Sequence, residues 1–244
     1  AALAIVLSVG VLVFAPVAAF TWRVDGAAVP WIAASAALEL VYFVLLAIAY
    51  RDSDVSLVYP IARGTAPVLV LLGGIVLLGH GTTVAQAAGV CAVGAGVVLV
   101  HGIRGHTDLR GLALALGIGV LIAGYTLVDK EGIRHAGPVP YLELVLLPSA
   151  LVYPVFVAKR RGTKALRSEL RPETVAVAIV LYATYVLILA ALKLAPAASV
   201  SAVRETSVVF ATALAAVLLR ERVGPRRLTG AALVAGGIAL LALG

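Results

Sequence analysis

The stretch that decides the fold is residues 196–243, PAASVSAVRETSVVFATALAAVLLRERVGPRRLTGAALVAGGIALLAL. It contains two apolar runs, each near the length of about 20 residues that a helix needs to cross a bilayer. The arginine-rich turn RERVGPRR separates them. Two adjacent charges, Arg204 and Glu205, lie inside the first run. Because a charge at membrane depth is costly, we expect it to face a bundle interior or a water-filled cavity.

The same stretch recurs earlier in the chain, displaced by 141 positions. In this register the following residues coincide without a gap: Arg204 with Arg63, Thr206 with Thr65, Gly230 with Gly89, and Gly237 with Gly96. Apolar composition alone would align valines and leucines, but it would not readily align a buried arginine and two helix glycines together. The register therefore predicts an internal duplication, which is a signature of transporter folds.

The composition predicts a polytopic membrane protein. Of 244 residues, 62% are hydrophobic and 13% are charged, whereas soluble proteins have about 25% charged residues. The net charge of +7 does not indicate a nucleic-acid partner, because the Lys and Arg residues lie in short loops between apolar runs. The single cysteine, Cys91, excludes an internal disulfide framework.

Nine apolar runs are predicted to form helices, and none shows the alternation of a barrel strand. They are 1–20, 29–49, 56–79, 84–102, 110–129, 139–158, 173–193, 196–219 and 225–243. We expect Pro172 and Pro225 to start helices. The predicted fold class is an all-α membrane protein.

The duplication also predicts the number of helices. Two repeats are expected, residues 1–104 and 105–244, and the second has five runs while the first has four. The partner of run 110–129 would precede residue 1. We therefore expect ten transmembrane helices in the intact protein, with the first one missing here. An odd number of helices in each repeat makes the repeats inverted in the membrane.

Basic residues predict the orientation. Thirteen of the 19 Lys and Arg residues lie in the loops after runs 29–49, 84–102, 139–158 and 196–219. The loops of the opposite face carry four, which are Arg23, Lys130, Arg134 and Lys193. The positive-inside rule places the first face in the cytoplasm of a multi-pass protein of the inner or plasma membrane.

Run 56–79 begins SLVYPIARGTAP and predicts the wall of a cavity. Tyr59, Pro60, Arg63 and Pro67 share one helix face at spacings of three and four residues. The prolines free backbone carbonyls, which suits a helix beside a cavity. We expect Tyr59 and Arg63 to contact a substrate. In the alternative interpretation, Arg63 is a structural partner of a buried acid and Pro60 is only a kink.

Run 196–219 places Ser201, Arg204, Glu205 and Thr212 on a broad face. Adjacent helical residues diverge by about 100°, so Arg204 and Glu205 are not expected to pair with each other. We expect Arg204 to reach an acid and Glu205 to reach an arginine or a substrate amine, with Ser201 as a further substrate contact. The alternative is a fixed network that packs helices.

Glu39 lies near the middle of run 29–49 and is the best candidate for proton coupling, with Glu205 as the second. Buried carboxyl groups serve as proton relays in transporters. A permanent ion pair between Glu39 and Arg63 or Arg204 is the alternative. Tyr42 and Tyr125 are predicted substrate contacts, although aromatic residues at helical spacing often only pack helices.

Three other acids are expected near the membrane surface. Asp129 would pair with Lys130 or cap its helix, with a role in gating as the alternative. Glu143 would extend to the interface, and Glu221 would form exposed ion pairs. The paired glycines and their small neighbours are expected to let helices approach closely, within one chain or in a homodimer.

Enzyme signatures are absent from the sequence. It has no G-x-S-x-G, H-E-x-x-H or phosphate-loop motif. The four histidines are scattered over loop positions, so no metal site is predicted. No catalytic residue and no cofactor are expected.

The chain resembles the drug/metabolite transporter superfamily, specifically its EamA-like transporter family. The matching stretches are AYRDSDVSLVYPIARGTAPVLVLLGG, GYTLVDKEG and RETSVVFATALAAVLLRERVGPRRLTGAALVAGGIALL. The resemblance implies two repeats, ten helices around a central cavity and transport of small polar or amphipathic solutes. It implies motif roles for Pro60, Arg63, Pro67, Arg204, Glu205 and Glu221. Two departures are the missing first helix and His80, which stands where many repeats have Glu.

The sequence thus predicts a carrier that moves an amino-acid-like metabolite by alternating access, as an exporter that is coupled to protons. Its partners would be a small-molecule substrate and the lipid bilayer, and it would be a monomer or a homodimer. The alternatives are a membrane assembly or sensor subunit that does not transport, and a lipid-linked-sugar flippase on the same fold.

Overall fold

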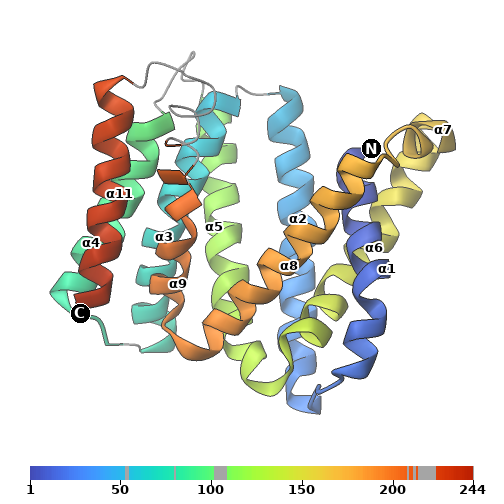
Figure 1. Ribbon diagram of the computed structural model, residues 1–244, viewed down its shortest axis with the longest axis horizontal. Coiled ribbons are helices and arrows are strands. Elements are labelled where there is room, and N and C mark those ends of the chain that lie inside the picture. Colours follow the sequence, from blue (N-terminus) through green and yellow to red (C-terminus); the bar gives the residue numbers. More distant parts are fainter. Residues whose placement is uncertain are drawn as a thin grey trace. The chain divides into compact units, whose positions relative to one another are not determined.

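The computed structural model describes residues 1–52, 55–79, 81–101, 109–207, 209–210, 213 and 224–243. Over these residues the chain is helical (Figure 1), and its only β-type pairing is an isolated bridge between Val24 and Ala136. The helices are α1 (Ala2–Phe20), α2 (Val29–Asp52), α3 (Val55–Leu78), α4 (Val84–His101), α5 (Leu109–Gly132), α6 (Pro138–Arg161), α7 (Thr163–Arg167), α8 (Pro172–Leu194), α9 (Ala197–Arg204) and α11 (Pro225–Leu243), with 3₁₀ turns η1 (Gly26–Ala28) and η2 (Ile133–His135).

The predicted all-α membrane fold is confirmed. Eight of the nine apolar runs each correspond to one helix, and the described part of run 196–219 begins with α9. Pro172 and Pro225 are the first residues of α8 and α11. One loop prediction is wrong. The basic segment after α6 contains the short helix α7, which begins after Gly162 at the positive φ of 78° that glycine adopts without strain.

Five of the described helical segments are long and apolar enough to cross a bilayer, namely Ala2–Phe20, Gly26–Ala49, Leu109–His135, Pro138–Arg161 and Pro172–Leu194. Large apolar side chains cover their outer faces: Leu12 is 72% exposed, Phe20 96% and Leu187 70%. An apolar surface this extensive is unfavourable in water but matches the hydrocarbon of a bilayer. The chain is therefore a multi-pass membrane protein.

Contacts between residues divide the chain into two compact units. The first unit contains Ala1–Leu40 and Val128–Leu194, and the second contains Val41–Leu127 and Ala195–Gly244. The boundaries fall inside α2 and α5, so the units differ from the two sequence repeats. The repeats remain a prediction from the duplicated register.

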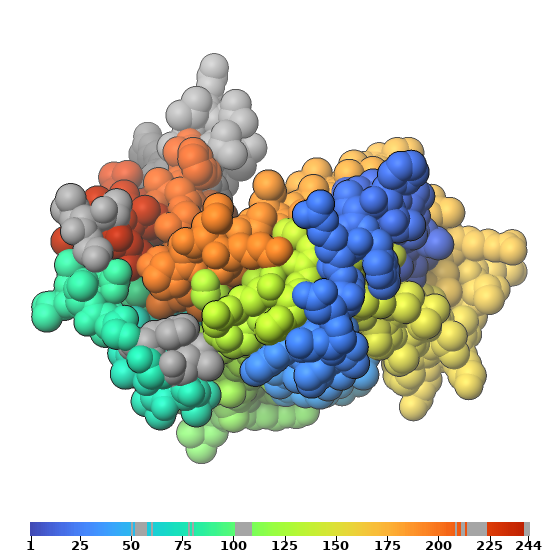
Figure 2. All heavy atoms as spheres, turned by 90° about the horizontal axis from the view of Figure 1, so that it is seen from below, coloured from blue at the N-terminus to red at the C-terminus, as the bar shows by residue number. Residues whose placement is uncertain are grey.

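The first unit is built around α1, which packs against α6 and α8. In Figure 2 the blue α1 lies beside the yellow residues of α6, although the two are far apart in the sequence. The rings of Phe14 and Tyr182 stack at 4.2 Å between centroids. Gly10 permits this close contact, because a Cβ atom there would lie 3.2 Å from the Tyr182 ring.

The second unit is built around the contact of α4 with α11. Valines of α4 and Val234 of α11 form its buried core. Gly89 meets Gly237 and Gly96 meets Gly230, each pair through backbone atoms. The duplicated register exchanges these two pairs, because it maps Gly89 onto Gly230 and Gly96 onto Gly237. A contact that maps onto itself in this way has the geometry of a two-fold axis.

Candidate functional site

An ion pair joins Arg63 of α3 to Glu205, the residue that follows α9. Nη2 of Arg63 lies 3.1 Å from Oε1 of Glu205, and Nε donates to Oε2 at 3.2 Å. The Glu205 side chain is 5% exposed and the Arg63 side chain 24%. This two-point geometry fixes both groups in direction as well as in distance. Glu205 therefore reaches an arginine, which is one of the two partners that the sequence allowed.

Tyr59 extends this cluster by one helical turn. The guanidinium carbon of Arg63 lies 5.8 Å from the centroid of the Tyr59 ring, within the range of a cation–π contact. Tyr59 is 37% exposed. Ser201 lies one turn before Glu205 and is 3% exposed. The cluster therefore offers a cation, an anion and an aromatic ring, and Ser201 shares the helical face of Glu205.

The helix that carries Glu205 is broken at this residue, so the prediction of one continuous helix over 196–219 is wrong here. α9 ends at Arg204, and the Glu205 N–H donates to Ala202 O at 3.0 Å, three residues back instead of four. Helical residues resume at Thr206. The Thr206 hydroxyl donates to Val203 O, so a side chain satisfies one carbonyl beside the break. In transporters, interrupted helices of this kind line the binding site.

The ion pair lies away from the first turns of α3 and α9. Arg63 is eight residues beyond the start of α3 and Glu205 eight beyond the start of α9, which is about 12 Å along each helix axis. The two helices run in opposite directions, since α3 begins at the top of Figure 1 and α9 begins at the bottom. The charges are thus about two turns from the start of either helix.

A second buried polar cluster surrounds Asp129 in the first unit. Asp129 is 1% exposed and accepts hydrogen bonds from Ser35 Oγ at 2.5 Å, Tyr141 OH at 3.0 Å and Tyr185 OH at 2.9 Å. Asp129 is therefore buried among hydroxyl groups of its own unit, and its expected place near the membrane interface stays a prediction. Hydroxyl groups from α2, α6 and α8 take the place of water around its carboxylate, which makes burial tolerable.

Two further acids lie inside the first unit. Glu39 is 3% exposed and lies one turn beyond Ser35 in α2. Glu143 is 8% exposed and accepts a hydrogen bond of 2.6 Å from Tyr182 OH. The prediction that Glu143 extends to the interface is therefore wrong, because a tyrosine from α8 solvates it within the unit.

Sequence reasoning missed the hydroxyl donors Ser35, Tyr141, Tyr182 and Tyr185. One signal was present, since Ser35 precedes Glu39 by four residues and so shares its helix face. The tyrosines gave no such signal. Each tyrosine lies on a different helix from the acid to which it donates, so no sequence spacing links the two residues.

The remaining predicted residues have diverse environments. The ring of Tyr125, 4% exposed, meets that of Tyr42 edge-on at 5.8 Å, so this pair packs α2 against α5. Pro67 is buried in α3, and Arg204 is partly buried at the end of α9. Glu221, Thr212, His80 and the side chain of Pro60 lie outside the described residues. In the part of the chain that the structure describes, no group of three His, Cys, Asp or Glu side chains could hold a metal.

Comparisons with known proteins agree with this fold. One crystal structure of a protein aligns with a TM-score of 0.76 and 17% sequence identity, covering 98% of this chain and 85% of that chain. At this identity the similarity shows the fold alone. No curated protein matches the sequence. The family model of the EamA-like transporters matches residues 109–243, more than half of the chain. The chain therefore belongs to the EamA-like transporter family and is a multi-pass membrane transporter.

Proposed function

We propose that this transporter exports a small polar or amphipathic metabolite of the amino-acid type by alternating access across the inner or plasma membrane. The observation that carries the proposal is the Arg63–Glu205 ion pair at the broken helix. It places one cation and one anion 3.1 Å apart inside an apolar unit. These are the two charges that a zwitterionic solute would need to meet.

The chemistry of exchange follows from the cost of buried charge. Breaking a buried ion pair is unfavourable, because each partner is left without a counter-charge. A zwitterion removes that penalty, since its carboxylate replaces Glu205 beside Arg63 and its ammonium replaces Arg63 beside Glu205. Tyr59 offers an aromatic face to the apolar part of the solute. Ser201 and Arg204 supply further polar contacts from α9.

Glu39 is the proposed proton carrier for coupled transport. It is almost fully buried in an otherwise apolar stretch of α2. A buried carboxyl group of this kind can bind and release a proton, as carboxyl groups do in the proton relays of transporters. We assign Glu205 to the solute, because its carboxylate is held by Arg63.

Counterflow in proteoliposomes tests the proposal. Proteoliposomes that contain the full-length protein would be loaded with unlabelled amino acids, and their uptake of radiolabelled amino acids would be measured. The variants are Arg63→Gln, Glu205→Gln and the charge-exchanged pair Arg63→Glu with Glu205→Arg. The control is Arg161→Gln, which removes an exposed arginine at the end of α6.

We expect each single variant to lose saturable exchange by at least about tenfold, because one charge-assisted contact is worth roughly 1.5–3 kcal/mol. The charge-exchanged pair should remain folded but should not exchange the same solute, since its carboxylate would now meet a glutamate. Wild-type exchange by that pair would show that the ion pair only packs helices. Absence of flux from inserted wild-type protein for every amino acid would overturn the proposal.

A further inference from the structure

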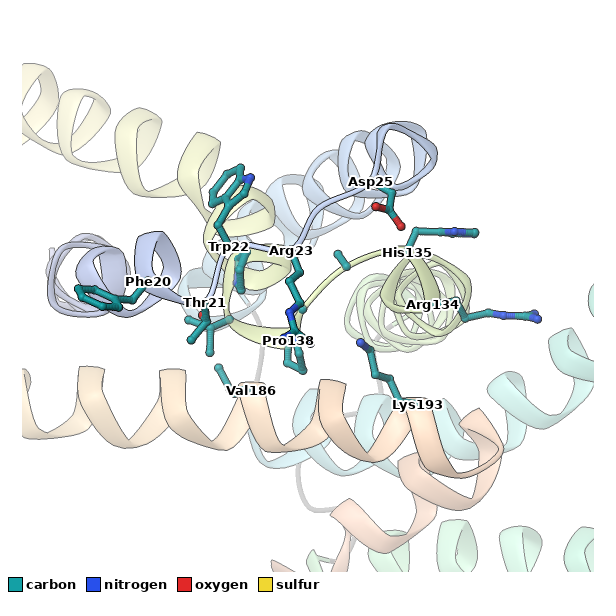
Figure 3. Close-up of a pocket in the computed structure, with 14 residues that line it drawn as sticks. Phe20, Thr21, Trp22, Arg23, Asp25, Arg134, His135, Pro138, Val186 and Lys193 are labelled. Atoms are coloured by element: carbon teal, nitrogen blue, oxygen red, sulfur yellow. The ribbon is translucent and has the colours of Figure 1, made fainter.

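A cavity of about 810 Å³ opens at one end of the first unit. It lies where α1, α5 and α8 end and where α2 and α6 begin (Figure 3). Its volume is within the range of about 300–1,000 Å³ that is typical of small-molecule sites. It contains none of the residues of the Arg63–Glu205 cluster.

Basic residues dominate the charged lining of this cavity. Arg23, Arg134 and Lys193 line it together with His135, against the single acid Asp25. The loops of this face contain four Lys and Arg residues in all, and the fourth, Lys130, donates to Leu192 O beside Lys193. Three of these four basic residues therefore line one cavity, and the fourth lies beside the end of α8.

Two of these cations are available to a ligand. Arg134 is held by Glu131, with 3.0 Å between Nη1 and Oε2. Among the residues that the structure describes, Arg23 and Lys193 have no acidic partner. Figure 3 shows Lys193 extending from α8 toward the segment that carries Arg23, while Arg134 extends away from it.

The backbone around the cavity is fixed by hydrogen bonds between its two loops. The Asp25 N–H donates to His135 O at 3.0 Å, and the Gly137 N–H donates to Arg23 O at 2.6 Å. These bonds flank the bridge between Val24 and Ala136. The position of Arg23 is thus set by the fold and not only by its loop. Apolar side chains, including Phe20, Trp22 and Val186, form other parts of the wall.

We propose that this cavity is a second ligand site, which binds the anionic group of an amphipathic molecule between Arg23 and Lys193. The ligand class is a carboxylate or phosphate attached to an apolar body. The group can come from a soluble metabolite or from the headgroup of an anionic lipid, since the cavity lies at the ends of membrane-spanning helices. The site acts independently of the proposed transport chemistry, because it requires only binding.

The two tryptophans of the chain allow a local test. Trp22 lines the cavity, and Trp31 is the only other tryptophan. Within these 244 residues, a Trp31→Phe substitution leaves Trp22 as the only tryptophan, and a bromine atom bound at contact distance quenches its fluorescence. The protein would be placed in nanodiscs of phosphatidylcholine and titrated with 4-bromobenzoate. The uncharged 4-bromobenzamide is the matched probe.

The test variant is Arg23→Gln with Lys193→Gln. The control is Lys159→Gln with Arg161→Gln, which removes the same charge from exposed positions at the other end of α6. We expect 4-bromobenzoate to quench Trp22 saturably in the wild-type background. In the test variant, the concentration that gives half-maximal quenching should rise at least about tenfold. The amide should give no saturable quenching. Quenching should also weaken as salt screens the charges.

A second set of nanodiscs, with phosphatidylglycerol added, identifies the source of the anion. The site is assigned to a lipid headgroup by two results together. 4-Bromobenzoate no longer quenches Trp22 in these nanodiscs, and native mass spectrometry finds phosphatidylglycerol bound to wild type but not to the test variant. Unchanged quenching assigns it to a soluble anion. Equal quenching by the amide, or equal affinity in the test and control variants, would overturn the proposal.

Discussion

Gly96 of α4 and Gly230 of α11 meet backbone to backbone. A Cβ atom on Gly96 would lie 2.7 Å from Gly230 O, and one on Gly230 would lie 2.8 Å from Gly96 O. Neither glycine can carry a side chain unless the helices separate. Small residues at such a crossing let two helices gain contact along their whole length, which is how helices associate in lipid.

Gly96→Ala should therefore destabilise the second unit. The added methyl group forces α4 and α11 apart, and overpacking of this kind costs about 1–3 kcal/mol. The control is Gly236→Ala in α11, where a Cβ atom would meet nothing within 4 Å. Thermal unfolding followed by circular dichroism would show a lower midpoint for Gly96→Ala than for Gly236→Ala, and equal midpoints would contradict the close crossing.

Asp129→Asn should destabilise the first unit. The amide has one acceptor oxygen in place of two, so the three hydroxyl groups that face Asp129 can no longer all be satisfied. A buried donor left without a partner costs about 1–3 kcal/mol. Asp25→Asn, at an exposed aspartate of the same unit, is the control. The prediction fails if both variants unfold at the same temperature.

The two halves of the Arg63–Glu205 pair should differ in their effect on stability. Arg63→Gln leaves a carboxylate that is only 5% exposed without its cation, whereas Glu205→Gln leaves an arginine that is 24% exposed and lies over Tyr59. We expect Arg63→Gln to cost up to about 3–5 kcal/mol, and Glu205→Gln to cost less.

Denaturant unfolding of the double variant Arg63→Gln with Glu205→Gln completes this cycle. Because neither side chain is then charged, its loss of stability should be smaller than the sum of the two single losses. Purely additive losses would show that the two groups are not energetically coupled.

Glu39→Gln should separate exchange from accumulation if Glu39 carries the coupling proton. Solute counterflow would continue, because it needs no net proton movement, but accumulation driven by an imposed pH gradient would be lost. Glu173→Gln removes an exposed acid from the first turn of α8 and serves as the control. Gradient-driven accumulation that survives in Glu39→Gln would exclude this role.

The sequence predicted most of the fold because helix length and apolarity are local properties. A bilayer requires runs of about 20 apolar residues, and each predicted run corresponds to a helix whose first or last residue lies within three positions of the expected one, except at α9. The exception has a local cause, since α9 ends at Arg204, where Glu205 and Thr206 replace the regular backbone bonding.

The polar clusters were predicted less well because their partners come from distant segments. Asp129 stands beside Lys130 and near the end of an apolar run, which is the usual pattern of a surface residue. Only the packing of α2, α6 and α8 brings Ser35, Tyr141 and Tyr185 to it. For Glu205, in contrast, an arginine was one of the two predicted partners, because a buried carboxylate needs a cation; the sequence did not say that this arginine is Arg63.

The Arg63–Glu205 ion pair can form at only one of the two equivalent positions that the duplicated register predicts. In the register of the duplication, Gly64 stands where the second copy has Glu205, and it lets α3 touch α4, since a Cβ atom there would lie 2.8 Å from Gly94 O. Two identical copies would form two equivalent ion pairs, and turning the molecule over would leave them unchanged. The register maps the Arg63–Glu205 pair onto Arg204 and Gly64. Because glycine has no carboxylate, this second position cannot form the equivalent ion pair. Under the proposed function, a zwitterionic solute at this pair would place its carboxylate toward α3 and its ammonium toward α9, and no second site would exist in which the two repeats exchange these roles.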